Sequence, residues 1–478
     1  MGDSLAILTT RTQVLLGAGV IAVLLLSFLI TNSLLPIVGI LGLVVMWVIL
    51  RDPVYSIIGF IAINVIITLH PKADTIGGAP SGFELVLGFC LVSIIGYWIF
   101  RIRIFEWSSL SESPVQISLM LFFVWSILVT IGGVILNQNS PAIAVRELLN
   151  LLPLLIMPVL YVRFIIPGSK AENWLFASVL FSGCLFVIGS VFQIRSNIVQ
   201  AYYLFQTGKG TIDITLAPFI IAIIVSYLMV EKQPWRIRAA ILLILLEATG
   251  VAISLSRNSY VATPIASMIV LSLGSWKERK RGGRRILLIA GIASVAVIIM
   301  MHFSRILSLL VKSYLHRLVT TQRLGHDLAL RERLAEWSGE WFAIKQSPIV
   351  GHGFGSSFRA FDLGRGVHTW MNFSHSSYLY IIFKTGIIGT LLFFIPFFTF
   401  LYNGFKLART KSLPDRSRIV ARGCVGALII LLFAAYLGPV FDSKTDLMWV
   451  GLIWGYFLAL ERQIHANATD LNTSFLPI

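Results

Sequence analysis

Apolar runs of around 20 residues recur along nearly the whole of this 478-residue chain. Each run is long enough to cross a hydrocarbon core about 30 Å thick as a helix, and polar breaks separate about fourteen of them. They start near residues 13, 34, 53, 82, 115, 147, 173, 211, 237, 259, 285, 376, 420 and 446. Because a helix satisfies its own backbone hydrogen bonds in lipid, the sequence predicts an all-α integral membrane protein, a polytopic bundle of about 12 to 14 transmembrane helices.

The composition excludes other classes of protein. The chain is 57% hydrophobic and 13% charged, whereas roughly a quarter of the residues of a soluble protein are charged. A soluble enzyme and a disordered chain are therefore excluded, and so is an outer-membrane barrel, whose short alternating strands would leave a different pattern. Cys90, Cys184 and Cys424 lie inside apolar runs without CxxC spacing, so we expect neither a disulfide framework nor a zinc site.

The positive charge is distributed unevenly between the two sides of the predicted bundle. The formal charge is +16, from 38 Lys and Arg against 22 Asp and Glu. With a cytoplasmic N-terminus, the cytoplasmic segments hold about 21 Lys and Arg and the opposite short connections about five, which is a positive-inside pattern with both termini in the cytoplasm. The basic cluster Lys277–Arg285 then anchors the protein at anionic membrane lipids, which we favour over a nucleic-acid patch.

One long polar loop interrupts the pattern. Residues 303–375 separate an N-terminal part of the bundle, 1–302, from a C-terminal part, 376–478, and the topology places this loop outside the cytoplasm. Its positive balance on the outer face suggests a negatively charged ligand. Within it, Leu328 to Gln346 has the spacing of an amphipathic helix, with an apolar stripe of Leu330, Leu334, Trp337, Trp341 and Ile344. The simplest interpretation is that the two tryptophans seat this helix at the lipid interface.

Three arginines are candidates for binding such a ligand. Arg257 lies at the outer end of the ninth span among hydroxyls and an amide, with almost no neighbouring carboxylate; the alternative is that it reaches lipid headgroups. Arg333 precedes Trp337 by one helical turn. Arg146 opens the sixth span beside Glu147, so a simple local ion pair is its alternative role.

A histidine marks the point where the outer loop re-enters the membrane. His375 opens the twelfth span within a run of hydroxyls that includes Ser376 and Tyr378. The usual role of a histidine at a helix start is structural. A functional one could accept a proton from a hydroxyl or hold that hydroxyl in position, because imidazole titrates near neutrality. Ser376, Tyr378 and Trp337 are then candidates for contacting or supporting an acceptor.

Other motifs favour structural roles. The glycine-rich segment Pro348–Gly355 follows a helix and not a strand, so we expect a tight turn in preference to a phosphate cradle. The outer segments contain neither a DxD pair nor a convincing His, Asp and Glu cluster, so no metal is predicted. Glu247 and Lys384 lie deep in predicted spans, and we expect them to pair or to face a watery cavity.

Taken together, several short motifs resemble the O-antigen ligase and O-antigen polymerase superfamily over residues of about 210 to 400. They are Ser256-Arg257, Arg333-x-x-x-Trp337, Pro348, Gly351-x-Gly353-x-Gly355, His375-Ser-x-Tyr-Leu379 and Gly386-x-x-Gly389. Two positions depart from the pattern of that superfamily: Ser376 stands where Asn is common, and Asp213 lies where the sequence is often rich in Asn.

The resemblance implies a glycosyltransferase of the bacterial inner membrane that acts in the outer loop, on the periplasmic side, without a cofactor, a metal or a nucleotide sugar. The donor would be a glycan linked to undecaprenyl pyrophosphate, and the acceptor a hydroxyl of a glycolipid, as in a ligase acting on lipid A-core, or of a repeat unit, as in a polymerase. Arg257 and Arg333, with Arg146 as a third candidate, would bind the pyrophosphate, and His375 would orient or deprotonate the attacking hydroxyl. The sequence does not identify a protein partner.

Three other functions fit a chain with this many spans. A lipid-linked oligosaccharide flippase or another transporter would have short loops and polar groups spread through the membrane core, whereas this chain concentrates His, Arg and Trp in one outer loop. A peptidoglycan polymerase of the shape, elongation and division class uses the same lipid carrier but has different motifs. A loop that only docks a partner protein would leave Arg257 and His375 dispensable.

Overall fold

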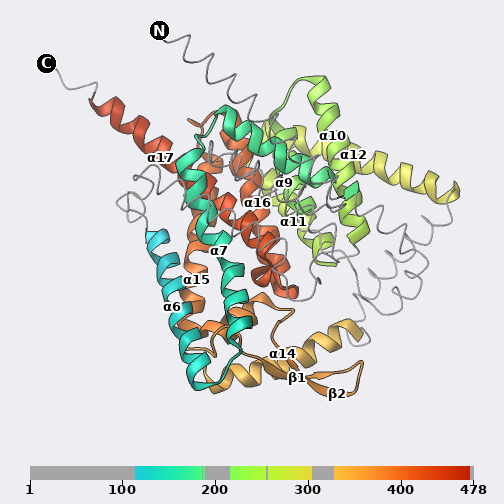
Figure 1. The fold of residues 1–478 in the computed structure, drawn as a ribbon. Coiled ribbons are helices and arrows are strands. Elements are labelled where there is room, and N and C mark those ends of the chain that lie inside the picture. Colours follow the sequence, from blue (N-terminus) through green and yellow to red (C-terminus); the bar gives the residue numbers. More distant parts are fainter. Residues whose placement is uncertain (1–113, 186, 189–215, 255–256, 304–327, 474–478) are drawn as a thin grey trace, which may run out of the picture. The chain divides into compact units, whose positions relative to one another are not determined.

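A computed structural model describes residues 114–185, 187–188, 216–254, 257–303 and 328–473 (Figure 1). All of them belong to one compact unit of the chain. The spans predicted near residues 13, 34, 53 and 82 and the first part of the outer loop lie outside the described residues, as do Cys90 and Asp213. The side chain of Arg257 lies outside them as well.

The described part of the chain is built almost entirely from helices, which confirms the predicted all-α membrane fold. Each predicted span from residue 115 onward is helical where it is described. The described helices include α6 (Pro114–Leu136), α7 (Pro141–Phe164), α9 (Leu216–Val230), α10 (Pro234–Ser254), α11 (Arg257–Ser272), α12 (Trp276–Phe303), α14 (Leu328–Gln346), α15 (Ser377–Arg409), α16 (Asp415–Leu437) and α17 (Lys444–Thr473). Among the described residues, α6, α7, α15 and α16 are long and apolar enough to cross a membrane.

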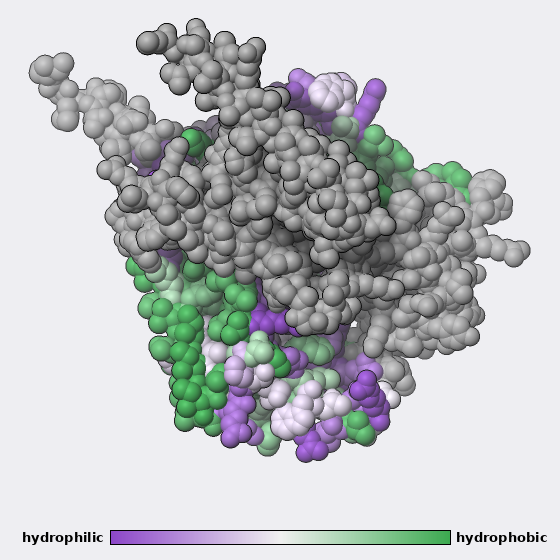
Figure 2. Space-filling model, viewed as in Figure 1, coloured by the Kyte–Doolittle hydropathy of each residue, from purple (hydrophilic) through white to green (hydrophobic). Residues whose placement is uncertain are grey.

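Helix α6 shows why these segments suit a bilayer. One side of it leaves large apolar side chains exposed, including Leu121, Val124, Leu128 and Ile135. In Figure 2 this side forms a continuous hydrophobic surface. Such a surface is unfavourable in water and is satisfied by lipid tails, so α6 lies at the lipid-facing edge of the described unit.

Small residues allow the helices to pack closely. Gly451 and Gly455 on α17 face α7, where a Cβ on Gly451 would lie 2.7 Å from the Pro153 carbonyl oxygen. On α16, a Cβ on Gly423 would lie 2.6 Å from the Ile223 side chain, and one on Gly426 the same distance from Val270 of α11. Membrane helices pack by this kind of close backbone approach because lipid gives little hydrophobic drive for association.

The described part of the outer loop combines one helix with a small sheet. Helix α14 spans the residues from Leu328 to Gln346, as the apolar spacing predicts. Strands β1 (Phe358–Asp362) and β2 (Val367–Met371) form an antiparallel pair that the sequence did not predict. Each strand has five residues, too few for alternation to identify it against the irregular loop around it.

The hairpin is attached to α14 by close packing. Strand β1 lies along α14 (Figure 1), and the Arg359 carbonyl occupies the space that a Cβ on Gly339 would need. Ile344 of α14 and Phe358 of β1 pack with Phe383 of α15 in one apolar cluster. The outer loop is therefore held against the first turns of α15, the helix that follows His375.

Candidate active site

Helix α15 is broken near its start, and the break organises the outer loop. Gly386 has a φ of 64° and a ψ of −173°, which interrupts the helical hydrogen bonds. The carbonyl oxygens released by the break accept three hydrogen bonds from other segments. The donors are the backbone N–H of His352 to Phe383 at 2.9 Å, that of Gly353 to Lys384 at 2.9 Å, and the indole N–H of Trp125 to Thr385 at 2.8 Å.

The glycine-rich segment fills this break. Gly351, Gly353 and Gly355 all have a φ between 80° and 83°, a region that favours glycine. The backbone N–H of Gly355 donates to the Glu147 carboxylate at 2.7 Å. The backbone N–H of Phe354 donates to the hydroxyl of Thr130. Because these N–H groups are used within the protein, the segment is a tight turn, as predicted, and not a phosphate cradle.

Gly353→Ala is expected to lower the unfolding midpoint of the protein in detergent and to reduce its free energy of unfolding by about 1 to 3 kcal/mol. An alanine at this position would have to keep a positive φ, and its Cβ would lie 2.7 Å from the Val129 carbonyl oxygen. Gly366→Ala is the matched control, because Gly366 also has a positive φ, of 68°, but has open space around it. Equal losses for the two variants would show that packing at Gly353 adds nothing.

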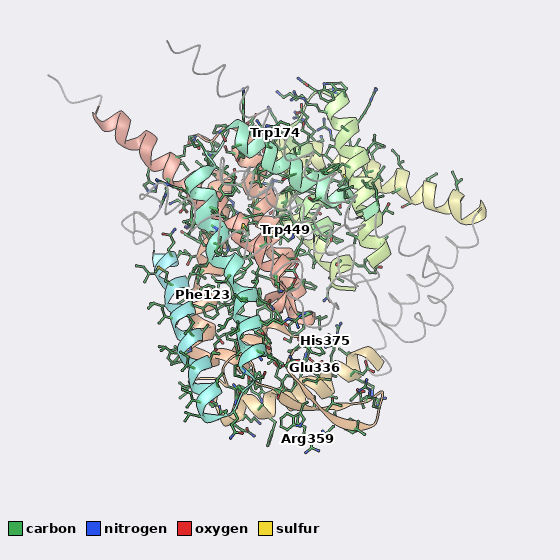
Figure 3. All side chains as sticks on the ribbon, in the orientation of Figure 1. Phe123, Trp174, Glu336, Arg359, His375 and Trp449 are labelled. Carbon is green, nitrogen blue, oxygen red and sulfur yellow. The ribbon has the colours of Figure 1, made fainter. Side chains whose placement is uncertain are left out.

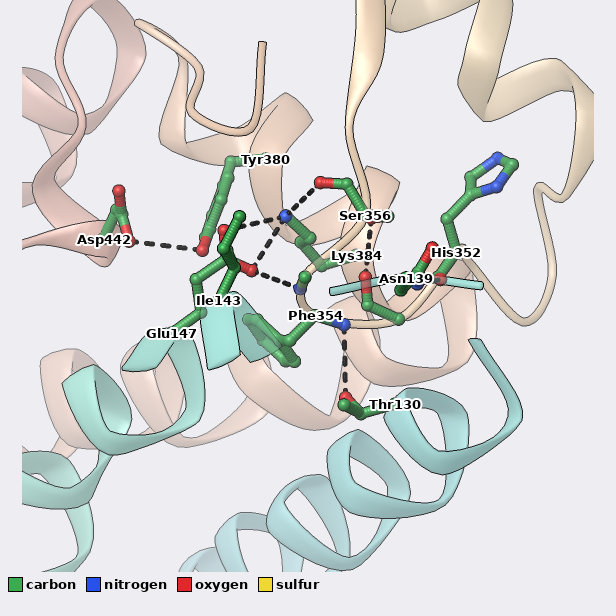
Figure 4. Close-up of polar contacts among 12 residues, drawn as sticks. Thr130, Asn139, Ile143, Glu147, His352, Phe354, Ser356, Tyr380, Lys384 and Asp442 are labelled. Atoms are coloured by element: carbon green, nitrogen blue, oxygen red, sulfur yellow. Dashed lines mark hydrogen bonds and ion pairs between the residues drawn. The ribbon is translucent and has the colours of Figure 1, made fainter. Parts of the chain in front are cut away.

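A buried ion pair ties the same turn to two membrane helices. The Lys384 ammonium lies 3.0 and 2.8 Å from the two carboxylate oxygens of Glu147 and 2.8 Å from the Ser356 carbonyl oxygen (Figure 4). Lys384 is fully buried. Its expected pairing is confirmed, and its partner is Glu147. The alternative role suggested for Arg146, an ion pair with the adjacent Glu147, is wrong, because Glu147 pairs across the bundle and the Arg146 side chain is exposed.

Glu247, the second ionisable residue predicted deep in a span, has a different environment. It is fully buried in α10 and faces Gly183, where a Cβ would lie 2.7 Å from its carboxylate oxygen. Among the described residues, neither of its oxygens has a hydrogen-bond partner. Its expected pairing is thus not found in the part of the chain that the structure describes.

His375 is held by a carboxylate on the outer helix. Its Nδ1 lies 2.6 Å from Oε2 of Glu336, and its backbone N–H donates to Oε1 of the same residue at 2.6 Å. The Glu336 side chain is 5% exposed, whereas the His375 side chain is 40% exposed. Figure 3 shows the two residues side by side, with Glu336 near the middle of α14. The imidazole is thus bound to Glu336 through Nδ1 and remains partly exposed.

A second carboxylate, one turn along α14, holds the residue before His375. The Ser374 hydroxyl donates to Oε2 of Glu340 at 2.7 Å and accepts from the backbone N–H of Ser376 at 3.0 Å. Burial raises the pKa of Glu340 to about 8, and the negative charge of Glu336 contributes to the rise. Helix α14 therefore holds three consecutive residues at the entry to α15.

The structure brings some of the predicted site residues together. Arg333 and Trp337 lie on α14 within one turn of Glu336, and the Trp337 ring is 5.8 Å from the ring of Tyr436 on α16. His375 joins them through Glu336. Arg257 is the first residue of α11, a helix that also packs against α16.

Two candidate support residues are turned to structural roles. Tyr378 donates its hydroxyl to the Leu432 carbonyl oxygen at 2.8 Å and stacks on Phe394 with ring centroids 5.3 Å apart. Ser376 is buried at the N-cap of α15 without a side-chain cap hydrogen bond. The contacts of Tyr378 hold the first turn of α15, the helix that follows His375.

Comparison with known proteins locates this site within a family segment. Residues 239–394 match the family model for O-antigen ligase. The predicted resemblance is therefore confirmed over about a third of the chain, and that O-antigen ligase segment includes Arg257, Arg333 and His375. No curated protein matches the chain at a significant level.

Sequence reasoning missed the two carboxylates that contact the His375 region. Glu336 and Glu340 both lie in the O-antigen ligase segment, and their spacing of four residues places them on one face of α14. That spacing was the available signal, but it does not predict that Glu336 contacts His375, 39 residues further along the chain. Glu147 lies outside the O-antigen ligase segment and still supplies the ion pair to Lys384 inside it. Within the described ranges, no group of three His, Cys, Asp or Glu is arranged to hold a metal.

Proposed function

We propose that this membrane protein transfers a glycan from undecaprenyl pyrophosphate to a sugar hydroxyl on the periplasmic face of the bacterial inner membrane. The acceptor is lipid A-core in a ligase or a repeat unit in a polymerase. The observation that carries the proposal is the contact between His375 and Glu336, on the helix that also carries Arg333. The match of residues 239–394 to the O-antigen ligase model supports the same reaction class.

The proposed reaction exchanges one bond at the anomeric carbon for another. The acceptor hydroxyl oxygen attacks that carbon, and the bond from the carbon to the pyrophosphate oxygen breaks. The bonding electrons leave with undecaprenyl pyrophosphate, and the hydroxyl proton passes to Nε2 of His375. The exposed ring of His375 is suited to this step because Nδ1 is already engaged by Glu336.

The negative charge that develops on the leaving group has to be stabilised, and arginine is suited to this. Its planar guanidinium binds phosphate oxygens in a bidentate manner and stays charged near a low-dielectric surface. Arg333 lies on α14 three residues before Glu336, which contacts His375. We assign the pyrophosphate to Arg333 and Arg257, with Arg146 as the more distant candidate.

The packing of α11 on α16 supports a place for Arg257 in the same site. The two helices run in opposite directions, since Arg422, in the first half of α16, pairs at 3.2 Å with Glu278, just beyond the end of α11. The start of α11 therefore runs toward the end of α16. Tyr436, which contacts Trp337 of α14, lies at that end. Helix rise places Tyr436 about 15 Å beyond Gly426 and Arg257 about 20 Å beyond Val270, which faces Gly426, so both residues lie toward the same end of this helix pair.

The orientation of the protein in the membrane is inferred from its basic residues. The basic cluster Lys277–Arg285 begins α12, and within it Arg285 donates to the Glu231 carbonyl oxygen at 2.8 Å, beyond the end of α9. A cation at this point interacts favourably with the negative end of the α9 helix dipole. With this end in the cytoplasm, residues 303–375 form a periplasmic loop between the bundle parts 1–302 and 376–478.

His375→Ala is expected to abolish glycan transfer while the protein is expressed and inserted normally, because the variant has no base for the acceptor hydroxyl. The measurement is gel analysis of surface polysaccharide in a deletion strain that carries the variant. Loss of all long chains from lipid A-core, with glycan persisting on the lipid carrier, indicates a ligase. Single-repeat products indicate a polymerase.

His368→Ala is the matched control for this experiment. His368 is an exposed histidine of the same loop, on β2, and it contacts Phe361 across the hairpin. We expect unchanged polysaccharide from that variant. A normal gel pattern from His375→Ala would contradict the proposed function, and it would favour a flippase or a docking role for the loop.

A further inference from the structure

We propose that Glu336 is the positioning residue for His375, holding the imidazole with its proton on Nδ1 so that Nε2 is the free acceptor. This inference rests on the proposed function, because it concerns how that base is prepared. Glu336 acts through His375 and is not assigned a contact with substrate.

The hydrogen bonds determine which nitrogen carries the proton. Oε1 of Glu336 accepts from the backbone N–H of His375, and Oε2 lies 2.6 Å from Nδ1. An ionised carboxylate can only accept, so Nδ1 has to be the donor in the second contact. A neutral imidazole with the proton on Nδ1 has its lone pair on Nε2, which is the arrangement that a general base needs.

The surroundings hold Glu336 in this orientation. Its side chain is 5% exposed, and α14 is held in place because β1 packs against it at Gly339 and Ile344 is packed against Phe383. The two ends of the contact are thus on elements that are themselves fixed.

Glu340, one turn further along α14, holds the residue before His375. Its side chain lies on the same face of α14 as that of Glu336, and burial raises the pKa of Glu340 to about 8. Glu340 accepts from the Ser374 hydroxyl, so it fixes the chain next to the imidazole while Glu336 contacts the ring itself.

Glu336→Gln gives a specific test, because an amide has one oxygen and one NH₂ group. The backbone N–H of His375 can only donate, so it takes the amide oxygen. The NH₂ group then faces Nδ1 and forces it to accept, which moves the ring proton to Nε2. We expect kcat to fall on the order of a hundredfold with KM nearly unchanged, since the base is blocked and the binding residues are intact.

The measurement has two independent readouts in proteoliposomes. Nitrogen-15 NMR of labelled histidine reports the tautomer, with the His375 signals assigned by their loss in His375→Gln. Transfer is assayed with undecaprenyl-pyrophosphate-linked glycan and lipid A-core isolated from the producing cells. Glu332→Gln, an exposed carboxylate on the same helix, is the matched control and should change neither readout.

The outcomes separate this inference from the proposed function. An unchanged tautomer and an unchanged kcat in Glu336→Gln, with His375→Ala inactive, would overturn the positioning role alone. A proton moved to Nε2 with full transfer activity would show that His375 is not the base, and so would overturn the proposed function. A moved proton together with a loss of kcat supports both.

Discussion

Lys384→Met is expected to lower the free energy of unfolding by about 3 to 5 kcal/mol, because it leaves the Glu147 carboxylate buried without its cation. Lys384 is fully buried and holds both oxygens of Glu147 and the Ser356 carbonyl oxygen. The loss should be measured as the shift of the unfolding transition when denaturing detergent is added to mixed micelles.

The double variant Lys384→Met with Glu147→Leu tests the cause. Removing both charges leaves no unpaired ion, so we expect this variant to be more stable than either single variant. Lys411→Met is the matched control, because Lys411 is an exposed lysine between α15 and α16. Additive losses in the double variant would show that the ion pair contributes no coupling energy.

Arg333→Ala and Arg257→Ala are each expected to slow glycan transfer by roughly a hundredfold, which corresponds to about 3 kcal/mol in the barrier. The reason is that each removes a donor to the charge that develops on the leaving pyrophosphate. Arg257→Lys should recover only part of the activity, because a point charge lacks the planar fork. Transfer is measured in proteoliposomes with lipid-linked glycan and lipid A-core.

Arg331→Ala serves as the control for the arginine variants. Arg331 is exposed on α14, two residues from Arg333, and has no role in the proposed site. Full transfer by Arg333→Ala, at normal expression, would contradict its assignment. A strict requirement of the wild-type protein for a divalent ion would contradict it as well, since the arginines would then not be the main stabilising charges.

The first of these predictions concerns the stability of the protein, and the second concerns its catalytic activity. The ion pair of Lys384 and Glu147 fixes the glycine-rich turn against α15, nine residues after His375 in sequence. The arginines, in contrast, are proposed to bind the pyrophosphate. We expect the ion-pair variants to lose stability and the arginine variants to lose activity without losing stability. That result would distinguish residues that maintain the structure of the site from residues that take part in the reaction.

Hydropathy and spacing predicted the features that depend on neighbours in sequence. The membrane helices follow from apolar runs of the right length, and helix α14 was predicted from Leu328 to Gln346 because its apolar residues recur every three to four positions. The glycine-rich turn followed from three glycines after a helix. Arg257, Arg333 and His375 were selected from residue type and motif, and they lie in the segment that matches O-antigen ligase.

The partners of the polar groups were decided only by the tertiary structure. His375 meets Glu336 across 39 residues, and Lys384 meets Glu147 across 237. Periodicity reports which face of a helix is buried, but it carries no information about which distant carboxylate will compensate a buried charge. The break of α15 at Gly386 was likewise hidden in an apolar run, because its freed carbonyls are satisfied by a turn that only packing brings there.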